Sequence, residues 1–252
     1  MALINDVIGK TLLPKFERPA LRSGGIKAVE SIAKQELAPG TRLAALARKL
    51  LADVQDTAYT HVPVFDPAHG ILKCDCSELI NYIVQQVNPK ALEHLPTDAG
   101  HPFTRAHNFE EFFAQLPGVG KPSSEAWRKV EKASHLAPGD VVAWKNAAYV
   151  PGKGQTGHVM LVADKPRPVH VDGLLTGFDV PVIDSTSHGH GLGDLRNAER
   201  NGLGKGTIFI PTDVQGLPTG FQWESSVTPS PTAIRPNTLA FGRLTALTVK
   251  KA

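Results

Sequence analysis

Cysteine and aromatic residues are both scarce in this sequence. Its 252 residues include two cysteines, Cys74 and Cys76, and only 6% are aromatic. Because a single residue separates the two cysteines, a structural disulfide between them would need strained geometry. The sequence therefore excludes a fold held together by a disulfide framework, and the free thiols fit a reducing compartment.

Three further absences narrow the class of protein. The net charge is +3 with no dense basic run, so nucleic-acid binding has no support. The sequence contains no run of about 18 apolar residues, so it predicts no membrane-spanning helix. The first residues lack a basic stretch followed by an apolar one, because Asn5 and Asp6 interrupt it. We therefore expect a cytoplasmic location, with export by a route that needs no cleaved signal left open.

The chain changes character after residues 137–139, from helical patterns to strand-like ones. We expect a loose arm over residues 1–25, an irregular stretch over 59–73, and one domain over 26–252. Helices are predicted over residues 26–38, 41–55 (with Thr41 as N-cap), 76–88, 109–115 and 123–132. Strands are predicted over residues 140–145, 157–164, 180–185, 206–211, 220–224 and 238–249. The order predicts an α+β fold whose mostly antiparallel sheet packs on the cysteine-bearing helix.

The stretch around Cys76 opens that helix. Apolar residues recur there at helical spacing, at Leu79, Ile80, Ile83, Val84 and Val87. Asp75, Cys76 or Ser77 is suited to cap it. A cysteine in the first turn lies near free backbone N–H groups and the positive end of the helix dipole, which lower a thiol pKa. The position therefore favours a reactive thiol, although most cysteines are small buried core residues.

A thiol nucleophile needs a base, and the base needs a group that orients it. His158 stands out among the ten histidines because it follows Gly157 at the start of a strongly apolar strand. Asp184 ends the next predicted strand, where it could accept the other ring N–H of His158. A structural histidine and a turn-forming aspartate are the plainer interpretation of the same two residues.

Three motifs resemble those of the NlpC-like papain-fold cysteine peptidases. Residues 75–82, Asp-Cys-Ser-Glu-Leu-Ile-Asn-Tyr, resemble that family's Asp-Cys-Ser-Gly-Leu/Phe-Val-x-Tyr signature. Residues 136–144 resemble its Leu-x-Pro-Gly-Asp-Leu-Val-x-Phe strand, and residues 157–162 its strand with the catalytic histidine. Residues 182–185 fall where the family has a third polar residue. The resemblance spans roughly residues 59–190 and implies a papain-like domain.

The resemblance implies a role for each matched residue. Cys76 would be the nucleophile, His158 the base and Asp184 the orienter, with His188 as the other candidate for that third role. Backbone N–H groups at the helix start would stabilise an oxyanion, and Tyr59, Asp75, Ser77 and His188 are candidates to line the substrate or oxyanion site. Glu78 stands where the family usually has glycine, and Asp184 where it often has histidine.

The implied activity is hydrolysis of a peptide or amide bond, in bacterial cell-wall stem peptides or related amides. Three alternatives stay open: a non-catalytic binding module on the same fold, an acyltransferase or transpeptidase, and an antibacterial amidase effector. An effector would have an immunity or inhibitor protein as its partner. The sequence predicts no cofactor, and the loop over residues 188–194, with two histidines and Asp194, is an incomplete metal-ligand set.

Overall fold

A computed structural model describes most of the chain, in residues 37–118, 126–150, 154–171, 175–191, 193–194, 196, 201–224 and 231–245. The predicted arm over residues 1–25 and almost all of the predicted helix over 26–38 lie outside these ranges. The described helices are α2 Pro39–Asp53, α3 Cys76–Val87 and α4 Ala106–Gln115. Short 3-10 turns lie at Pro67–His69, Pro89–His94, Ala133–His135 and Pro231–Ala233.

The strands form two sheets. The small sheet contains β1 Asp56–Ala58, β3 Ile71–Lys73 and β2 Val64–Asp66, in that order. The strands of the large sheet are β4 Trp127–Val130, β10 Leu239–Leu244, β5 Val141–Lys145, β6 Gly157–Val162, β8 Leu175–Thr186, β7 Arg167–Val171 and β9 Gly202–Pro211. The order within it is β4-β10-β5-β6-β8-β7, with β9 also paired to β8, and every pairing is antiparallel.

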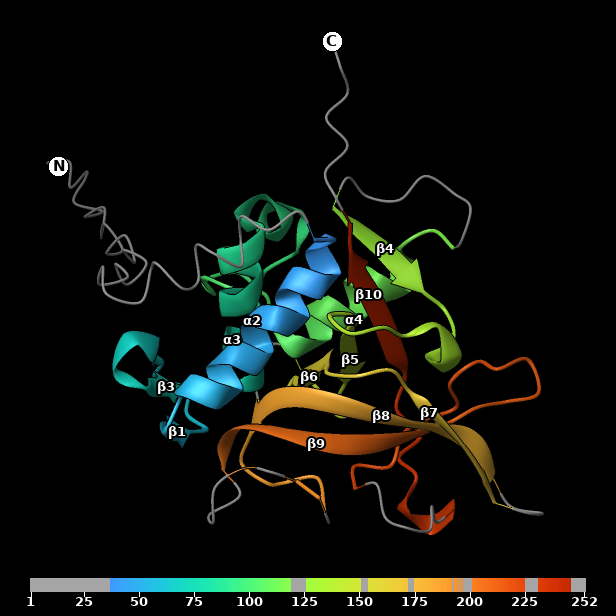
Figure 1. The fold of residues 1–252 in the computed structure, drawn as a ribbon. Helices are drawn as coiled ribbons and strands as arrows, with labels where there is room; N and C mark the ends of the chain where they lie inside the picture. Colours follow the sequence, from blue (N-terminus) through green and yellow to red (C-terminus); the bar gives the residue numbers. More distant parts are fainter. Residues whose placement is uncertain are drawn as a thin grey trace, which may run out of the picture.

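The helices and the large sheet form separate layers. Figure 1 shows α2 and α3 together on one side, with the long strands β8 and β9 curling past them. One apolar core fills the space between α3 and the sheet and includes Leu79, Ile83, Val159 and Leu161. A second core contains the alternate residues of the same strands, such as Met160. The expected α+β class and the packing of the sheet on the cysteine helix are confirmed.

Helix α3 agrees closely with its predicted range because its signals are local. The Asp75 side chain accepts the Glu78 N–H at 2.8 Å, and the Glu78 side chain accepts the Asp75 N–H at 2.8 Å. This reciprocal capping box satisfies two N–H groups that a helix end leaves free. The helix consequently begins at Cys76, and Asp75 is its N-cap.

Several predicted element limits are wrong. Helix α2 begins at Pro39, not at Thr41, because a proline fits the first helical position, where its missing N–H is not needed. The predicted helix over residues 123–132 contains strand β4 instead, whose Trp127 pairs with Leu244 on β10. The stretch over residues 59–73, expected to be irregular, contains strands β2 and β3 of the small sheet. Residues 220–224 make isolated bridges rather than a strand, and β7 was not predicted.

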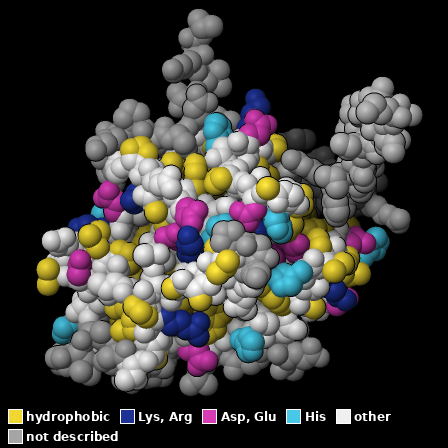
Figure 2. Space-filling model, turned by 180° about the vertical axis from the view of Figure 1, so that it is seen from behind, with side chains coloured by type: hydrophobic (Ala, Val, Ile, Leu, Met, Phe, Trp, Pro, Cys, Tyr) yellow, Lys and Arg dark blue, Asp and Glu magenta, His cyan; other side chains and the backbone are white. Residues whose placement is uncertain are grey.

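The surface carries mixed side chains. Figure 2 shows lysine, arginine, aspartate, glutamate and histidine interspersed with apolar groups on the face behind the view of Figure 1. Within the ranges that the structure describes, none of the helices has the length and apolar character needed to cross a membrane.

Candidate active site

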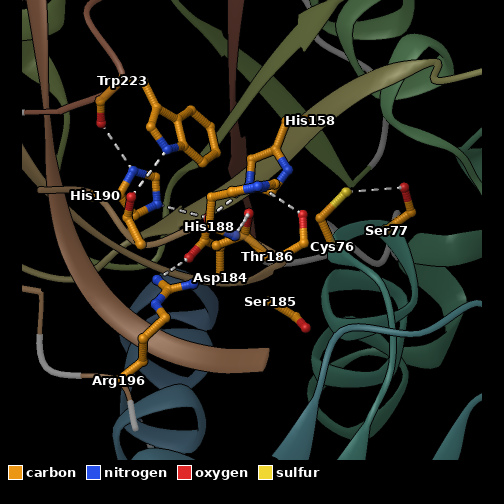
Figure 3. Close-up of polar contacts among 12 residues, drawn as sticks. Cys76, Ser77, His158, Asp184, Ser185, Thr186, His188, His190, Arg196 and Trp223 are labelled. Carbon is orange, nitrogen blue, oxygen red and sulfur yellow. Dashed lines mark hydrogen bonds and ion pairs between the residues drawn. The ribbon is translucent and has the colours of Figure 1, made fainter. Parts of the chain in front are cut away.

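Cys76 lies at the first position of α3, facing the start of strand β6. Its side chain is almost fully buried, and the sulfur lies 3.8 Å from the Ser77 hydroxyl. The backbone N–H of Val159 also hydrogen-bonds to this sulfur. Figure 3 shows the His158 ring between the Cys76 sulfur and a polar group formed by Asp184, His190 and Arg196.

The Cys76 thiol is held in its neutral form. Burial raises its pKa, and the nearby Asp75 carboxylate raises it further, while hydrogen bonds from Val159 and Ser77 lower it only in part. The sequence predicts the opposite shift from the helix dipole; the structure differs because removal from water outweighs a terminal dipole. The thiol therefore becomes a nucleophile only if a neighbouring base takes its proton.

His158 and Asp184 form a buried pair. His158 Nε2 lies 2.6 Å from Asp184 Oδ2, and their side chains are 7% and 0% exposed. Because a carboxylate only accepts hydrogen bonds, Nε2 carries the proton that it donates, and Nδ1 is left as the basic atom. Among the described residues, neither ring nitrogen of His158 has a hydrogen bond to the Cys76 sulfur, and Nδ1 has no other partner.

The sheet fixes the position of this pair. Leu161 lies opposite Ile183 in the β6–β8 ladder, so His158 and Asp184, three residues before and one after, project from the same sheet face. Gly157 precedes His158 with φ of +135°, and a side chain there would collide with the Trp144 carbonyl. Glycine at this position lets β5 and β6 approach closely where His158 begins.

Asp184 has more partners than a catalytic orienter needs. Its Oδ2 atom is also 2.9 Å from His190 Nε2, and its Oδ1 atom accepts from Arg196 Nη2 at 2.8 Å. Burial alone would raise the Asp184 pKa, but these cations and hydrogen bonds hold it well below its usual range. Asp184 is therefore a carboxylate in the resting protein.

The other predicted site residues are divided between two places. Tyr59 packs edge-on against the His61 ring, with the ring centroids 5.5 Å apart, and burial raises the pKa of its hydroxyl. Asp75 caps α3 and lies 3.2 Å from His61 Nδ1, while Ser77 contacts the sulfur. His188 instead bonds to Ser187 at 2.8 Å. Between the two candidates for the third role, Asp184 is thus the one bonded to His158.

Sequence reasoning missed His61, His190, Arg196 and Trp223. Trp223 packs edge-on against the His158 ring, with the ring centroids 5.0 Å apart, and also lies against His190. The glycine-rich loop over residues 188–194 is the sequence feature that could have indicated His190, because its histidines follow Asp184 closely in the sequence. Arg196 had no local signal. Within the described residues, no group of three or more His, Cys, Asp or Glu side chains is arranged to hold a metal ion.

The α3 N-terminus offers two backbone donors. The N–H groups of Cys76 and Ser77 are among the first of the helix, which has no internal acceptor for them. The structure gives neither N–H a hydrogen-bond partner among the described residues. Together with Cys76, His158 and Asp184, they supply the groups that acyl transfer through a thiol requires.

Comparison with known proteins identifies one uncharacterized relative. The chain is 31% identical over 110 residues to an uncharacterized protein of Acanthamoeba polyphaga mimivirus, which covers 39% of this chain. The match spans 48% of that relative, so the chain covers about half the length of the curated relative it matches. No family model matches the chain, and no solved structure matches it significantly.

Proposed function

We propose that the protein is a cysteine hydrolase that cleaves a peptide or amide bond with Cys76 as nucleophile, on a papain-like domain. The observation that carries the proposal is the buried His158–Asp184 pair, 2.6 Å apart, beside a helix that begins at Cys76. A solvent-excluded histidine fixed by a carboxylate, with one ring nitrogen free, is what activation of a neutral thiol needs.

The steps follow from the protonation states. His158 Nδ1 takes the Cys76 proton as the sulfur attacks the substrate carbonyl carbon, and an S–C bond forms. The oxyanion is stabilised by the backbone N–H groups of Cys76 and Ser77. His158 then gives its proton to the leaving amine as the C–N bond breaks. Water, deprotonated by His158, attacks the thioester, releasing the acid and restoring the thiol. The absent sulfur–imidazole hydrogen bond fits a resting site, since such bonds often tighten only when substrate binds.

We place the substrate among bacterial cell-wall stem peptides, on the resemblance of residues 75–82, 136–144 and 157–162 to the NlpC-like peptidases. Glu78 does not alter the nucleophile directly, because its carboxylate turns back to the Asp75 N–H.

Mass spectrometry of muropeptides incubated with the protein tests the proposal. We expect two cleavage products whose masses add up to that of the muropeptide plus one water, absent with Cys76→Ala and retained with Cys74→Ala as the matched control. Products joined to an added amine would indicate transfer instead of hydrolysis. Cleavage that survives Cys76→Ala would contradict the proposed nucleophile, and absence of any cleavage by wild type would contradict the proposed substrate.

A further inference from the structure

A buried ionic cluster lies behind His158. We call Asp184, His190, Asp194 and Arg196 the Asp184 cluster. In its ion pairs, the side chains of Asp184, His190 and Arg196 are all 0% exposed, and so is that of Asp194. Arg196 donates to Asp184 and to Asp194 at 2.8 Å each, and the backbone N–H of His190 donates to the Asp194 carboxylate at 2.6 Å. An arrangement so completely removed from water is stable only if its charges balance.

The ring of His190 has an acceptor at each nitrogen. Nδ1 lies 3.0 Å from the Trp223 carbonyl oxygen, and Nε2 lies 2.9 Å from Asp184 Oδ2. Neither a carbonyl nor a carboxylate can donate, so both ring nitrogens must carry protons for both hydrogen bonds to form. His190 is therefore an imidazolium. Burial by itself would lower its pKa, but the Asp184 charge and both hydrogen bonds outweigh burial and raise it.

The charges then sum to zero without His158. Asp184 and Asp194 supply two negative charges, and Arg196 and His190 supply two positive ones. The groups that face His190 are Asp184 on β8, Arg196 and Asp194 before β9, Trp223, and His158 on β6, with Glu224 beside the neighbouring Gly191.

We propose that His190 is a positioning residue: it stays an imidazolium and, as the second ring that donates to Asp184 Oδ2, it fixes the carboxylate that orients His158 beside Cys76. His190 and His158 share a single oxygen of Asp184, so the charge of one acts on the other over a very short distance. The catalytic meaning of this arrangement rests on the proposed function, but the protonation states do not.

Nitrogen-15 NMR of the full chain with labelled histidine tests this without any substrate. In wild type at pH 7 we expect His190 to carry protons on both ring nitrogens, and this signal should vanish in His190→Gln. In that variant the Asp184 carboxylate has lost one of its donors, so the ring signals of His158, which shares the same oxygen, should shift. His135→Gln, which changes an exposed histidine, is the matched control and should leave both features unchanged.

The split between kcat and KM, once a substrate is found, gives a second measurement. In His190→Gln, kcat should fall about tenfold with KM unchanged, because the His158 ring is no longer held in place while the substrate contacts remain. A merely structural role would lower stability but leave the kcat of the folded variant in place. A neutral His190 in wild type at pH 7, or unshifted His158 ring signals in a folded variant, would overturn the proposal. If His190→Gln does not fold, the wild-type spectrum, assigned with His158→Asn, still decides whether His190 is charged.

Discussion

His158 and His190 are bonded to one and the same oxygen, Oδ2 of Asp184, at 2.6 and 2.9 Å. The two rings come from different parts of the chain, one from the start of β6 and the other from the loop after β8. Both donate to a carboxylate whose second oxygen is occupied by Arg196. Asp184 thus serves the stability of the fold as well as the candidate chemistry, and its substitution should affect both.

We expect Asp184→Asn to lower the free energy of unfolding by about 3 to 5 kcal/mol, because it removes the counter-charge of buried His190 and one of the two carboxylates paired with buried Arg196. Chemical denaturation of the purified variants measures this. Asp53→Asn is the control: Asp53 pairs with Lys49 on an exposed helix face, where such a pair contributes less than about 1 kcal/mol. Equal losses in the two variants would contradict a charge-balanced buried cluster.

The labelling of Cys76 should depend on His158. Because burial and Asp75 raise the thiol pKa, little thiolate forms at pH 7 unless the proton passes to a base. We expect His158→Asn to slow iodoacetamide labelling of Cys76 by about 100-fold, within the usual range for general-base assistance. Cys74, which is 0% exposed, should stay unlabelled in the folded protein. Mass spectrometry of digested samples distinguishes the two cysteines, and a variant that labels as fast as wild type would rule out His158 as the base.

The sequence-based predictions are correct where nearby residues decide the structure and wrong where residues distant in the sequence decide it. Helix α3 was predicted correctly because its stripe of apolar residues and its Asp75 cap are encoded within 13 residues. The strand at Trp127 was predicted as a helix because its state is decided by pairing with Leu244, more than 100 residues away. Local patterns carry no information about such a partner.

The same distinction separates the candidate-site residues that the sequence could predict from those that it could not. Cys76, His158 and Asp184 could be named because each ends or begins an apolar element with a clear pattern. His190 and Arg196 could not be assigned, because they lie in irregular segments whose positions depend on how β8 and β9 pair. The length of that ladder, from Gly177 to Thr186, brings the loop back over Asp184.

Glu78 should make the stability of the protein fall as the pH rises. Burial, and then Asp75, raise its pKa from 4.5 to about 7. Between these values the folded state holds a proton that the unfolded chain has released, so increasing pH lowers the free energy of unfolding, by at most about 3 kcal/mol. Glu78→Gln keeps an acceptor for the Asp75 N–H and removes the titration.

Thermal unfolding at pH 4.5 and pH 7.5 checks this prediction. The difference between the two pH values should shrink in Glu78→Gln relative to wild type. The exposed Glu93, changed to glutamine, is the matched control and should leave the difference unchanged. An unaltered difference in Glu78→Gln would show that other groups govern stability in this range.

Gly157 should be the least replaceable glycine near the candidate site. Its φ is +135°, and an added Cβ would lie 1.9 Å from the Trp144 carbonyl oxygen. Gly154 also has a positive φ, +72°, but an added Cβ there meets nothing within 4 Å. Comparing alanine substitutions at the two glycines therefore distinguishes backbone strain from steric collision.

We expect Gly157→Ala to lower the free energy of unfolding by about 3 kcal/mol, since it adds strain and a backbone collision together. Gly154→Ala should cost about 1 kcal/mol, from strain alone. Because Trp144 lies opposite His158, pushing β5 away from β6 would also displace the His158 ring. Cys76 labelling in the folded protein should therefore slow in Gly157→Ala and stay unchanged in Gly154→Ala. Equal stability losses with equal labelling would show that the close approach at Gly157 does not position His158.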